Sequence, residues 1–337
     1  MVDFFSRATE DVLYARTGPL GRIVLNKPRS INALTHDMIH SLQAQLEEWA
    51  EDDSVSAVSV EGAGGRGLCS GGDVRFMRQS VLDGNADAVD FWADEYTMNL
   101  LIGEYPKPVV AFMDGVTMGG GVGVSGHASH RFATDRSRIA MPETAIGFSP
   151  DVGGMRLLSS APGEFGTYMA LTGEPVDGPT AVAAGFADAV VDHGEIPAII
   201  DRLAAGESPD AILEEAKKPV PELDLSWIDE CFAGDDPAAI LAALQSHPSG
   251  EAKAAAEVVE SRAPLSVAVA LEAVRRAKGM SLADVLKQDL VLGKSFTANP
   301  DFVEGVRAKL VDKDNDPHWQ HKSLKEVDRA TVLAQFS

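Results

Sequence analysis

Cysteine is scarce in this sequence, which contains only two, Cys69 and Cys231. They lie far apart in the chain, and neither has neighbouring Cys or His residues at the spacing of a metal site. A disulfide framework is therefore excluded, and we expect no bound metal ion.

Long apolar runs are also missing, because no stretch of about 18 consecutive apolar residues occurs. The N-terminal segment, MVDFFSRATEDVLYA, is too polar and too often interrupted for the apolar core of a secretion signal. The sequence therefore predicts a cytoplasmic protein.

Basic residues are few relative to acidic ones. The 29 Lys and Arg residues against 51 Asp and Glu residues give a formal net charge of −22. Proteins that bind nucleic acids or anionic membranes gather Lys and Arg against the phosphates, so we expect neither partner. An anionic small ligand is still compatible with this charge, because a few basic side chains or helix N-termini can set the local field.

Internal repeats of fixed period and low-complexity tracts are absent as well. The 337 residues, 45% of them hydrophobic and 24% charged, have the composition of an ordinary globular protein. Single cores stop growing at roughly 250 to 300 residues, so this length predicts one large domain with an appendage, or two unequal domains.

The N-terminal part alternates strand and helix signals. Val12–Arg16 and Arg22–Leu25 flank a turn that contains Gly and Pro, and they predict a hairpin. Thr35 is a suitable N-cap for a helix whose apolar residues recur at helical spacing as far as Trp49.

A strand followed by glycines and a helix-like stretch then occurs twice. Ser56–Glu61 leads into the glycine-rich segment 62–67, and Pro108–Met113 leads into Gly119-Gly120-Gly121. Repetition of this unit predicts an α/β fold with parallel strand pairs. Strand signals fade from residue 196 onward, where alanine-rich sequence predicts helices at 251–262 and 265–278.

The first glycine-rich segment has two rival interpretations. Gly62-x-Gly64-x-x-Gly67 follows a strand and formally matches the dinucleotide-binding fingerprint. That fingerprint opens a helix, however, and the next residues, Leu68–Gly72, are a poor helix start. We favour Ser70-Gly71-Gly72-Asp73 as the functional turn, with Asp73 as the N-cap of the next helix and N–H groups facing a ligand; a plain tight turn is the alternative.

The second glycine-rich segment, Gly119-Gly120-Gly121, lies where a strand passes into a predicted helix. Its N–H groups and the positive end of the helix dipole would face an anion or a developing oxyanion. Two such donors that converge on one oxygen form an oxyanion hole. Taken singly, each glycine segment is more often a turn than a site.

Two acids, Glu143 and Asp151, stand in the apolar, Gly- and Pro-rich stretch 141–154, which shows no helical periodicity. Burying an acid without a partner costs several kcal/mol, so acids in apolar loops are usually chemical or paired with a base. Surface carboxylates are the alternative. Combined with the two glycine segments, this stretch favours a catalytic site.

Three weaker patterns do not predict a site. Asp312-x-Asp314-x-Asp316 is similar to a calcium loop but has Pro317 where that loop requires Gly. His127 and His130 lack a third metal ligand at a supporting spacing, so we interpret them as structural or surface residues. Gly123-Val124-Ser125-Gly126-His127 lacks the final Gly of a nucleophile elbow, which argues against a serine hydrolase.

Four segments in order resemble the crotonase, or enoyl-CoA hydratase/isomerase, superfamily. They are Leu25-Asn26-Lys27-Pro28 with Asn32-Ala33-Leu34, Leu68-Cys69-Ser70-Gly71-Gly72-Asp73, Met118-Gly119-Gly120-Gly121 and Pro142-Glu143. The resemblance implies an α/β crotonase (ClpP-like) spiral of ββα units, an acyl-CoA substrate with no separate cofactor, and oxyanion donors at the N–H groups of Gly72 and Gly120. It also adds substrate-binding residues, namely Lys27, Ser70, Gly71 and Asp73.

Within that superfamily the chain is most similar to the 3-hydroxyisobutyryl-CoA hydrolase subfamily. Residues 141–154 resemble the active-site loop of that subfamily, and Asp94-Glu95-Tyr96 matches a segment whose Glu lines the substrate pocket. Phe302–Leu310 extends the match beyond the usual crotonase length. The resemblance thus assigns Glu143 and Asp151 to catalysis and substrate binding, and Glu95 to substrate binding.

One position departs from the hydratases of the superfamily, which use two glutamates to add water to a double bond. The first of those glutamates falls on Gly123 here. Glu143 and Asp151 remain for another reaction, which we expect to be hydrolysis of a short 3-hydroxyacyl-CoA thioester, with 3-hydroxyisobutyryl-CoA from valine catabolism as the expected substrate. Glu143 would be the nucleophile or the general base, and the sequence leaves both open. Enoyl-CoA hydration or isomerisation, and non-catalytic acyl-CoA binding, are the competing functions.

The expected organisation is a crotonase-like, acyl-CoA-binding catalytic core at residues 1–195 and a helical C-terminal region at 196–337 that completes the fold. The C-terminal helices are also a candidate surface for homo-oligomerisation.

Overall fold

The computed structural model describes residues 2–337, which form two compact units that interleave along the chain. The first unit comprises the chain up to Asp73, Asp94–Ala140 and Val176–Glu222, and the second comprises Val74–Ala93, Met141–Pro175 and Leu223–Ser337. These units group the chain differently from the predicted catalytic core at 1–195 and helical region at 196–337. That division by function stays a prediction.

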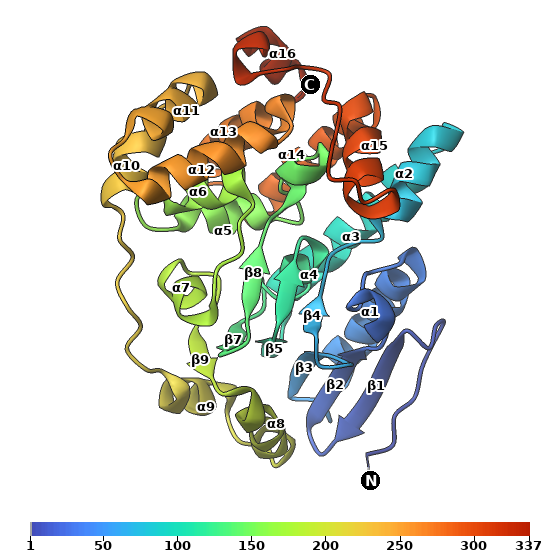
Figure 1. The fold of residues 1–337 in the computed structure, drawn as a ribbon. Coiled ribbons are helices and arrows are strands. Elements are labelled where there is room, and N and C mark those ends of the chain that lie inside the picture. Colours follow the sequence, from blue (N-terminus) through green and yellow to red (C-terminus); the bar gives the residue numbers. More distant parts are fainter. Residues whose placement is uncertain (1) are drawn as a thin grey trace. The chain divides into compact units, whose positions relative to one another are not determined.

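The strands within residues 2–337 all belong to the first unit and form two sheets (Figure 1). The larger sheet has the order β1-β2-β3-β5-β7-β9 and the smaller one β4-β6-β8. Only β1 and β2 pair antiparallel, and the other neighbours are parallel, as the repeated strand and helix signals predicted. The strands are β1 (Val12–Thr17), β2 (Leu20–Leu25), β3 (Ala57–Gly62), β4 (Gly67–Cys69), β5 (Val109–Met113), β6 (Val116–Met118), β7 (His130–Thr134), β8 (Arg138–Ala140) and β9 (Ala189–Val191).

Three successive chain segments each contribute one strand to each sheet. β4 follows β3, β6 follows β5 and β8 follows β7, and each pair is followed by a helical segment, namely α2 (Val74–Asp83), α4 (Gly120–Gly123) and η2 (Glu143–Ile146). This is the ββα repetition of the crotonase spiral, so the predicted fold class is confirmed. The residue pattern alone did not reveal β4, β6 and β8, because three residues are too few to show a period-2 alternation.

The predicted N-terminal hairpin and the helix after it are confirmed. β1 pairs with β2 from Val12 opposite Leu25 to Thr17 opposite Leu20. Helix α1 (His36–Glu51) begins after Thr35, whose side-chain oxygen accepts a hydrogen bond from Met38 N at 3.3 Å. The other helices of this unit are η1 (Pro28–Ser30), α7 (Gly178–Ala183), η3 (His193–Glu195), α8 (Ile196–Ala204) and α9 (Pro209–Ala216), and α3 (Asp87–Gly103) contributes the residues from Asp94 onward.

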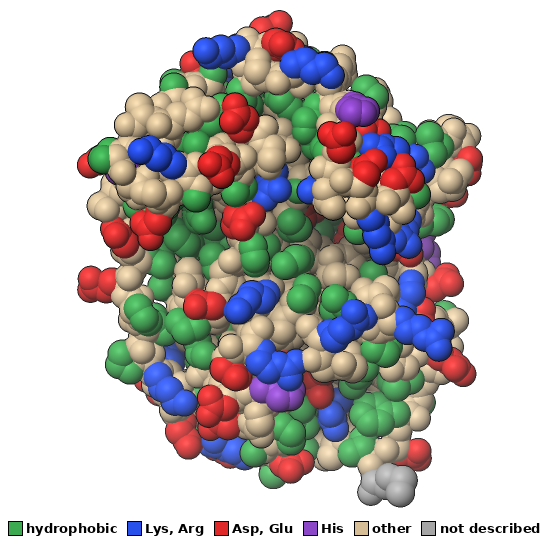
Figure 2. Space-filling view, in the orientation of Figure 1, with side chains coloured by type: hydrophobic (Ala, Val, Ile, Leu, Met, Phe, Trp, Pro, Cys, Tyr) green, Lys and Arg blue, Asp and Glu red, His purple; other side chains and the backbone are tan. Residues whose placement is uncertain are grey.

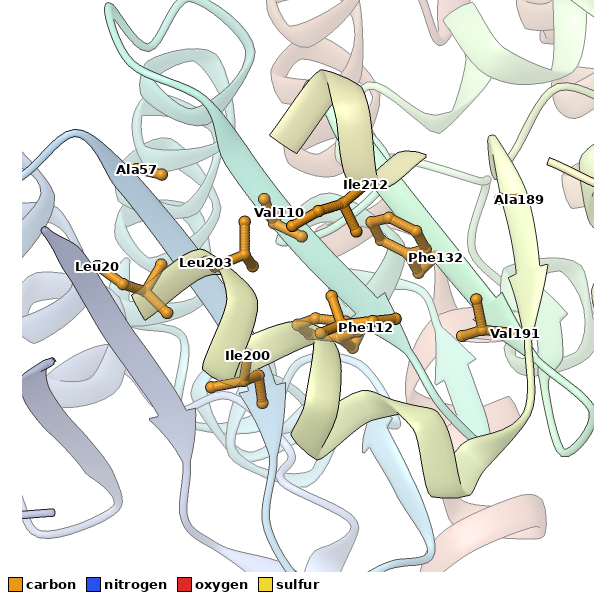
Figure 3. Packing of buried hydrophobic residues seen from close by; sticks show 11 residues of the cluster. Leu20, Ala57, Val110, Phe112, Phe132, Ala189, Val191, Ile200, Leu203 and Ile212 are labelled. Atoms are coloured by element: carbon orange, nitrogen blue, oxygen red, sulfur yellow. The ribbon is translucent and has the colours of Figure 1, made fainter. Parts of the chain in front are cut away.

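An apolar core joins the larger sheet to α8 and α9. Figure 3 shows Ile200 of α8 and Ile212 of α9 lying against Phe112 of β5 and Phe132 of β7. The rings of Phe112 and Phe132 stack with their centroids 5.7 Å apart. This packing fixes β5, the strand that leads toward β6 and the second glycine segment.

The second unit is helical within the described residues. The alanine-rich stretches form α12 (Gly250–Ser261) and α13 (Pro264–Ala277), so the predicted helices at 251–262 and 265–278 are confirmed. The remaining helices are α5 (Gly154–Ser160), α6 (Phe165–Thr172), α10 (Ser226–Phe232), α11 (Pro237–Ser246), α14 (Leu282–Thr297), α15 (Pro300–Val306), η4 (Arg307–Val311), η5 (Leu324–Glu326) and α16 (Arg329–Ala334).

Acidic and basic side chains are intermixed on the face shown in Figure 2. Of the helices formed by residues 2–337, none combines the length and the apolar character that crossing a membrane requires.

Candidate functional site

The two glycine segments of the first unit meet backbone to backbone. A Cβ placed on Gly71 would lie 3.7 Å from Gly120 N, and one placed on Gly120 would lie 3.2 Å from Gly72 N. A Cβ on Gly121 would overlap the carbonyl oxygen of Cys69. A side chain at Gly120 or Gly121 would therefore be crowded by the facing turn and by Glu95, which gives these two glycines a structural reason.

The turn that carries Gly72 is held by the segment before α1. Ser70 N donates to Ile31 O, Leu34 N donates to Gly71 O and Asp73 N donates to Leu34 O, each at 2.9 Å. Gly71 has a φ of 112°, a conformation that L side chains rarely adopt. These bonds fix the peptide groups on both sides of Gly72 and so fix the direction of its N–H group.

The helix after the second glycine segment is shorter than the sequence predicted. α4 comprises only Gly120–Gly123, preceded by Gly119 with a φ of 50° and a ψ of −121°. Val122 N and Gly123 N donate to Gly119 O, whereas the first N–H groups of a helical turn, such as that of Gly120, have no acceptor within it. A single helical turn has only a small dipole, so the predicted contribution of a helix dipole is wrong. Individual N–H groups are the donors that this segment offers to an anion.

Glu95 of α3 lies beside Gly120. Its Oε1 would be 2.5 Å from a Cβ on Gly120, and its side chain is buried, with the residue 2% exposed. Burial raises the pKa of the Cys69 thiol to about 12, and the charge of Glu95 adds to that effect. The first unit thus brings Gly72, Gly120 and Glu95 together, as expected for a shared site.

The other predicted substrate-binding residues of this unit lie at the more accessible edge of the same turn. Lys27 Nζ is 3.7 Å from Asp73 Oδ2, and both side chains are partly exposed. Ser70 is exposed, and its hydroxyl donates to Ser30 O at 2.9 Å. These positions leave a cation, a carboxylate and a hydroxyl accessible to a polar ligand.

Asn32, part of the family motif, has a structural role. Its Nδ2 lies 3.1 Å from the carbonyl oxygens of Ala63 and Gly67 and 3.0 Å from that of Leu68. It therefore braces the turn between β3 and β4. Because this turn joins two strands and does not open a helix, the rejected dinucleotide fingerprint is also excluded by the structure.

In the second unit, Glu143 and Asp151 belong to one short connection between β8 and α5, and both are buried. Glu143 is 6% exposed and Asp151 7% exposed, so the alternative of surface carboxylates is excluded. Glu143 begins η2 (Glu143–Ile146), Gly147 is its C-cap, and Phe148 N donates to Glu143 O at 3.1 Å. The stretch predicted to be irregular therefore contains one short 3₁₀ turn.

Phe148 anchors the middle of this connection. The centroid of its ring lies 5.0 Å from the ring centroid of Trp92, 5.3 Å from that of Phe296 and 5.4 Å from that of Phe302. Gly147 next to it has a φ of 71°, and a Cβ there would overlap the carbonyl group of Asp301. This cluster could not be predicted from the sequence, because its aromatic residues are far apart in the chain and form no local pattern.

Asp151 begins a tight turn, closed by a hydrogen bond from Gly154 N to Asp151 O at 2.7 Å. Gly153 N, within that turn, donates to Asp289 Oδ2 at 2.8 Å. Burial raises the pKa of the Asp289 carboxyl well above its usual value, and the charge of Asp151 raises it further. Asp289 was also missed, because no helix was predicted around it, although the flanking Val285, Leu292 and Phe296 recur at helical spacing.

Only one group of side chains within residues 2–337 has the composition and proximity to hold a metal ion. His36 Nε2 and His40 Nε2 lie 2.6 Å and 2.8 Å from Asp94 Oδ2, and the candidate ligand atoms fall within 4.8 Å of one another. Burial opposes ionisation of Asp94, but the hydrogen bonds of His40 and His36 outweigh it and lower the pKa. Hydrogen bonding accounts for this arrangement, so we assign it no metal.

The weaker sequence patterns have structural roles. His130 Nε2 lies 3.0 Å from Asp210 Oδ1, consistent with the predicted structural histidine. Arg307 forms ion pairs with Asp312 at 2.8 Å and Asp314 at 2.6 Å, so two acids of the calcium-like pattern surround a guanidinium group. This segment is the polar connection that was expected.

Comparison with known proteins identifies the family of this chain. The family described as enoyl-CoA hydratase/isomerase matches residues 20–336. The 3-hydroxyisobutyryl-CoA hydrolase of Homo sapiens is 35% identical over 98% of this chain and 89% of its own, and that of Rattus norvegicus is 36% identical over 97% and 89%.

Solved structures with the same fold carry names of other reactions. A carnitinyl-CoA dehydratase from Mycobacterium thermoresistibile has a TM-score of 0.93 and 46% identity, covering 98% of this chain and 97% of its own. An enoyl-CoA hydratase from Rhodobacter sphaeroides 2.4.1 has a TM-score of 0.92 and 36% identity, covering 97% of each chain. The chain therefore belongs to the enoyl-CoA hydratase/isomerase family and is an enzyme with the crotonase fold.

Proposed function

We propose that this enzyme hydrolyses the thioester of a short 3-hydroxyacyl-CoA, with 3-hydroxyisobutyryl-CoA as substrate and 3-hydroxyisobutyrate and CoA as products, a step of valine catabolism. The observation that carries the proposal is the pair of buried acids, Glu143 and Asp151, on a braced connection, in a chain that has Gly123 in place of the first hydratase glutamate. The names of the curated relatives support the same substrate.

Carbonyl activation would come from the N–H groups of Gly72 and Gly120. Negative charge develops on the thioester oxygen as the tetrahedral intermediate forms, and preorganised N–H donors stabilise that charge. The close approach of the two glycine segments, and the hydrogen bonds that fix the peptides around Gly72, support this role.

Glu143 would supply the catalytic carboxylate. As a nucleophile it would attack the thioester carbonyl, expel CoA as the thiolate and form an anhydride that water then hydrolyses. As a general base it would take a proton from the attacking water, with the same products. Asp151 and Glu95 would bind the 3-hydroxyl group and handle protons, and neither route requires a cofactor beyond the CoA of the substrate.

Enoyl-CoA hydration, or the reverse dehydration, is the second candidate function, because the solved relatives carry those names. Concerted addition of water to a double bond uses two acid/base groups. Gly123 has no side chain to provide one of them. Non-catalytic acyl-CoA binding is less consistent with two buried acids, since an unused buried carboxylate only destabilises the fold.

The proposal predicts strong selection for the substrate hydroxyl. A site built to hydrogen-bond a hydroxyl rejects the analogue without it, because buried polar groups are then unpaired, and the ratio of kcat/KM can reach roughly 10⁴-fold. We expect isobutyryl-CoA to be a poor substrate beside 3-hydroxyisobutyryl-CoA in an assay of free thiol release.

Asp151→Ala should narrow that ratio, because it removes a group proposed to bind the hydroxyl. The matched control is Asp316→Ala in the exposed C-terminal connection, which should leave the ratio unchanged. Equal kcat/KM for the two substrates in the parent enzyme would contradict the 3-hydroxyacyl assignment and indicate a general acyl-CoA thioesterase.

A further inference from the structure

Helix α14 has an acid in the middle of its buried face. Val285, Leu286, Leu292 and Phe296 make this face apolar, and Asp289 lies among them, 1% exposed. A carboxyl group in such surroundings costs several kcal/mol unless hydrogen bonds compensate, and an apolar residue at this position would avoid that cost. Asp289 therefore needs a reason beyond packing.

The reason lies in the turn that begins at Asp151. Asp289 Oδ2 accepts the hydrogen bond from Gly153 N at 2.8 Å, whereas its Oδ1 has no hydrogen-bond partner among the described residues. The two residues are 136 positions apart in the chain, and both belong to the second unit. One buried carboxyl oxygen is thus committed to a single amide of this turn.

The turn itself is strained. Val152 has a φ of 52° and Gly153 a φ of 74°, so both central residues are left-handed. For a β-branched residue such as Val152 this conformation is unusual and costs on the order of 1–3 kcal/mol, so it persists only where the surroundings hold it. The hydrogen bond between Gly154 N and Asp151 O closes the turn, and the Asp289 carboxyl binds the amide in between.

We propose that Asp289 is a positioning residue, whose carboxyl holds the left-handed Val152-Gly153 turn and thereby sets the placement of Asp151 for the reaction. Its effect on rate rests on the proposed function, whereas its effect on the turn does not.

The protonation of Asp289 agrees with this role. Burial raises the pKa of its carboxyl first, and the neighbouring charge of Asp151 raises it further, which favours the neutral form. A neutral carboxyl can accept the Gly153 N–H bond without placing a second negative charge beside Asp151. Asparagine, which is neutral and keeps an acceptor oxygen of the same reach, should therefore replace Asp289 well.

Hydrogen–deuterium exchange of the parent, Asp289→Asn and Asp289→Leu tests the turn directly. In Asp289→Leu the Gly153 amide loses its acceptor, so exchange in the peptide that covers 151–158 should accelerate by about tenfold or more. In Asp289→Asn the exchange should stay close to that of the parent. Asp301→Leu is the matched control, because Asp301 is also 1% exposed and accepts one backbone bond, from Gln320 N at 2.7 Å; its exchange should change around Gln320 and not in the turn.

Steady-state kinetics with 3-hydroxyisobutyryl-CoA give the second readout. A displacement of a catalytic group by about 1 Å can cost 10²-fold in rate, so Asp289→Leu should lower kcat/KM for this substrate by about that factor. Asp289→Asn should recover most of this loss. A general loss of structure would instead lower the melting temperature, which circular dichroism would reveal.

The outcomes separate the two claims. The positioning role is contradicted if exchange in the turn is unchanged in Asp289→Leu. It is also contradicted if the turn exchanges as fast in Asp289→Asn as in Asp289→Leu. If the leucine variant does not fold, the asparagine variant decides, and loss of its turn protection or of its activity contradicts the role. A parent that releases no thiol, together with exchange that accelerates only in the leucine variant, overturns the proposed function and leaves the positioning of the turn intact.

Discussion

Glu143→Gln should lower kcat for CoA release from 3-hydroxyisobutyryl-CoA by about 10²- to 10⁴-fold, the usual contribution of a positioned acid or base. The change removes the charge and the basicity but keeps the shape of a side chain that is 6% exposed. As the connection is anchored at Phe148, the loop should keep its conformation, and acyl-CoA affinity should survive. A thiol-release assay measures the loss of turnover. Titration calorimetry with a non-hydrolysable thioether analogue measures the acyl-CoA affinity.

Glu257→Gln is the matched control, because Glu257 lies on α12 of the same unit and is exposed. It makes the same chemical change and should leave kcat as it is. If Glu143→Gln keeps turnover within about tenfold of the parent, Glu143 is neither nucleophile nor base. If turnover instead falls as expected, trapping of an acyl-enzyme with hydroxylamine in the parent distinguishes a nucleophilic Glu143 from a general base.

Gly120→Pro should reduce kcat by about 10²- to 10³-fold, the cost of removing one oxyanion donor. Proline has no N–H group, and Gly120 is the first residue of α4, the helical position at which proline is best tolerated. The substitution therefore removes the donor and is compatible with the helical turn, although its added carbons also enter the space beside Glu95 Oε1. KM should change less than kcat, because the donor acts mainly on charge that develops in the transition state.

Gly120→Ala separates the donor from the added carbon. Both variants place a Cβ beside Glu95 Oε1 and Gly72 N, but alanine keeps the N–H group. The proline variant should be at least tenfold slower than the alanine variant, with native circular dichroism in both. Equal rates for the two folded variants would remove the Gly120 N–H from the oxyanion hole.

Local signals carried much of the fold prediction. Thr35 marked the start of α1 because a threonine N-cap and a helical apolar pattern coincide there, and the alanine-rich stretches marked α12 and α13. The ββα spiral came from the family resemblance, because β4, β6 and β8 have only three residues each and show no pattern of their own. The interleaving of the two units had no local signal at all.

The candidate site residues were likewise predicted where a local sequence signal exists and missed where none does. Gly72 and Gly120 could be proposed because glycines after strands are visible in a sequence, and Glu143 and Asp151 because acids in an apolar stretch are unusual. The contacts that hold them depend on residues distant in the chain, such as Asp289, 136 positions from Gly153. The short α4 corrected the expected helix dipole, since the boundaries of an element are the least reliable part of a prediction from sequence.

We propose that this family member cleaves a thioester and does not hydrate a double bond. One measurement compares free thiol release from 3-hydroxyisobutyryl-CoA with the loss of enoyl absorbance of crotonyl-CoA, at equal enzyme and substrate concentrations. We expect rapid thiol release and a hydration rate lower by about 10²-fold or more, because Gly123 provides no second acid/base group. Hydration of crotonyl-CoA that is faster than thiol release would contradict it.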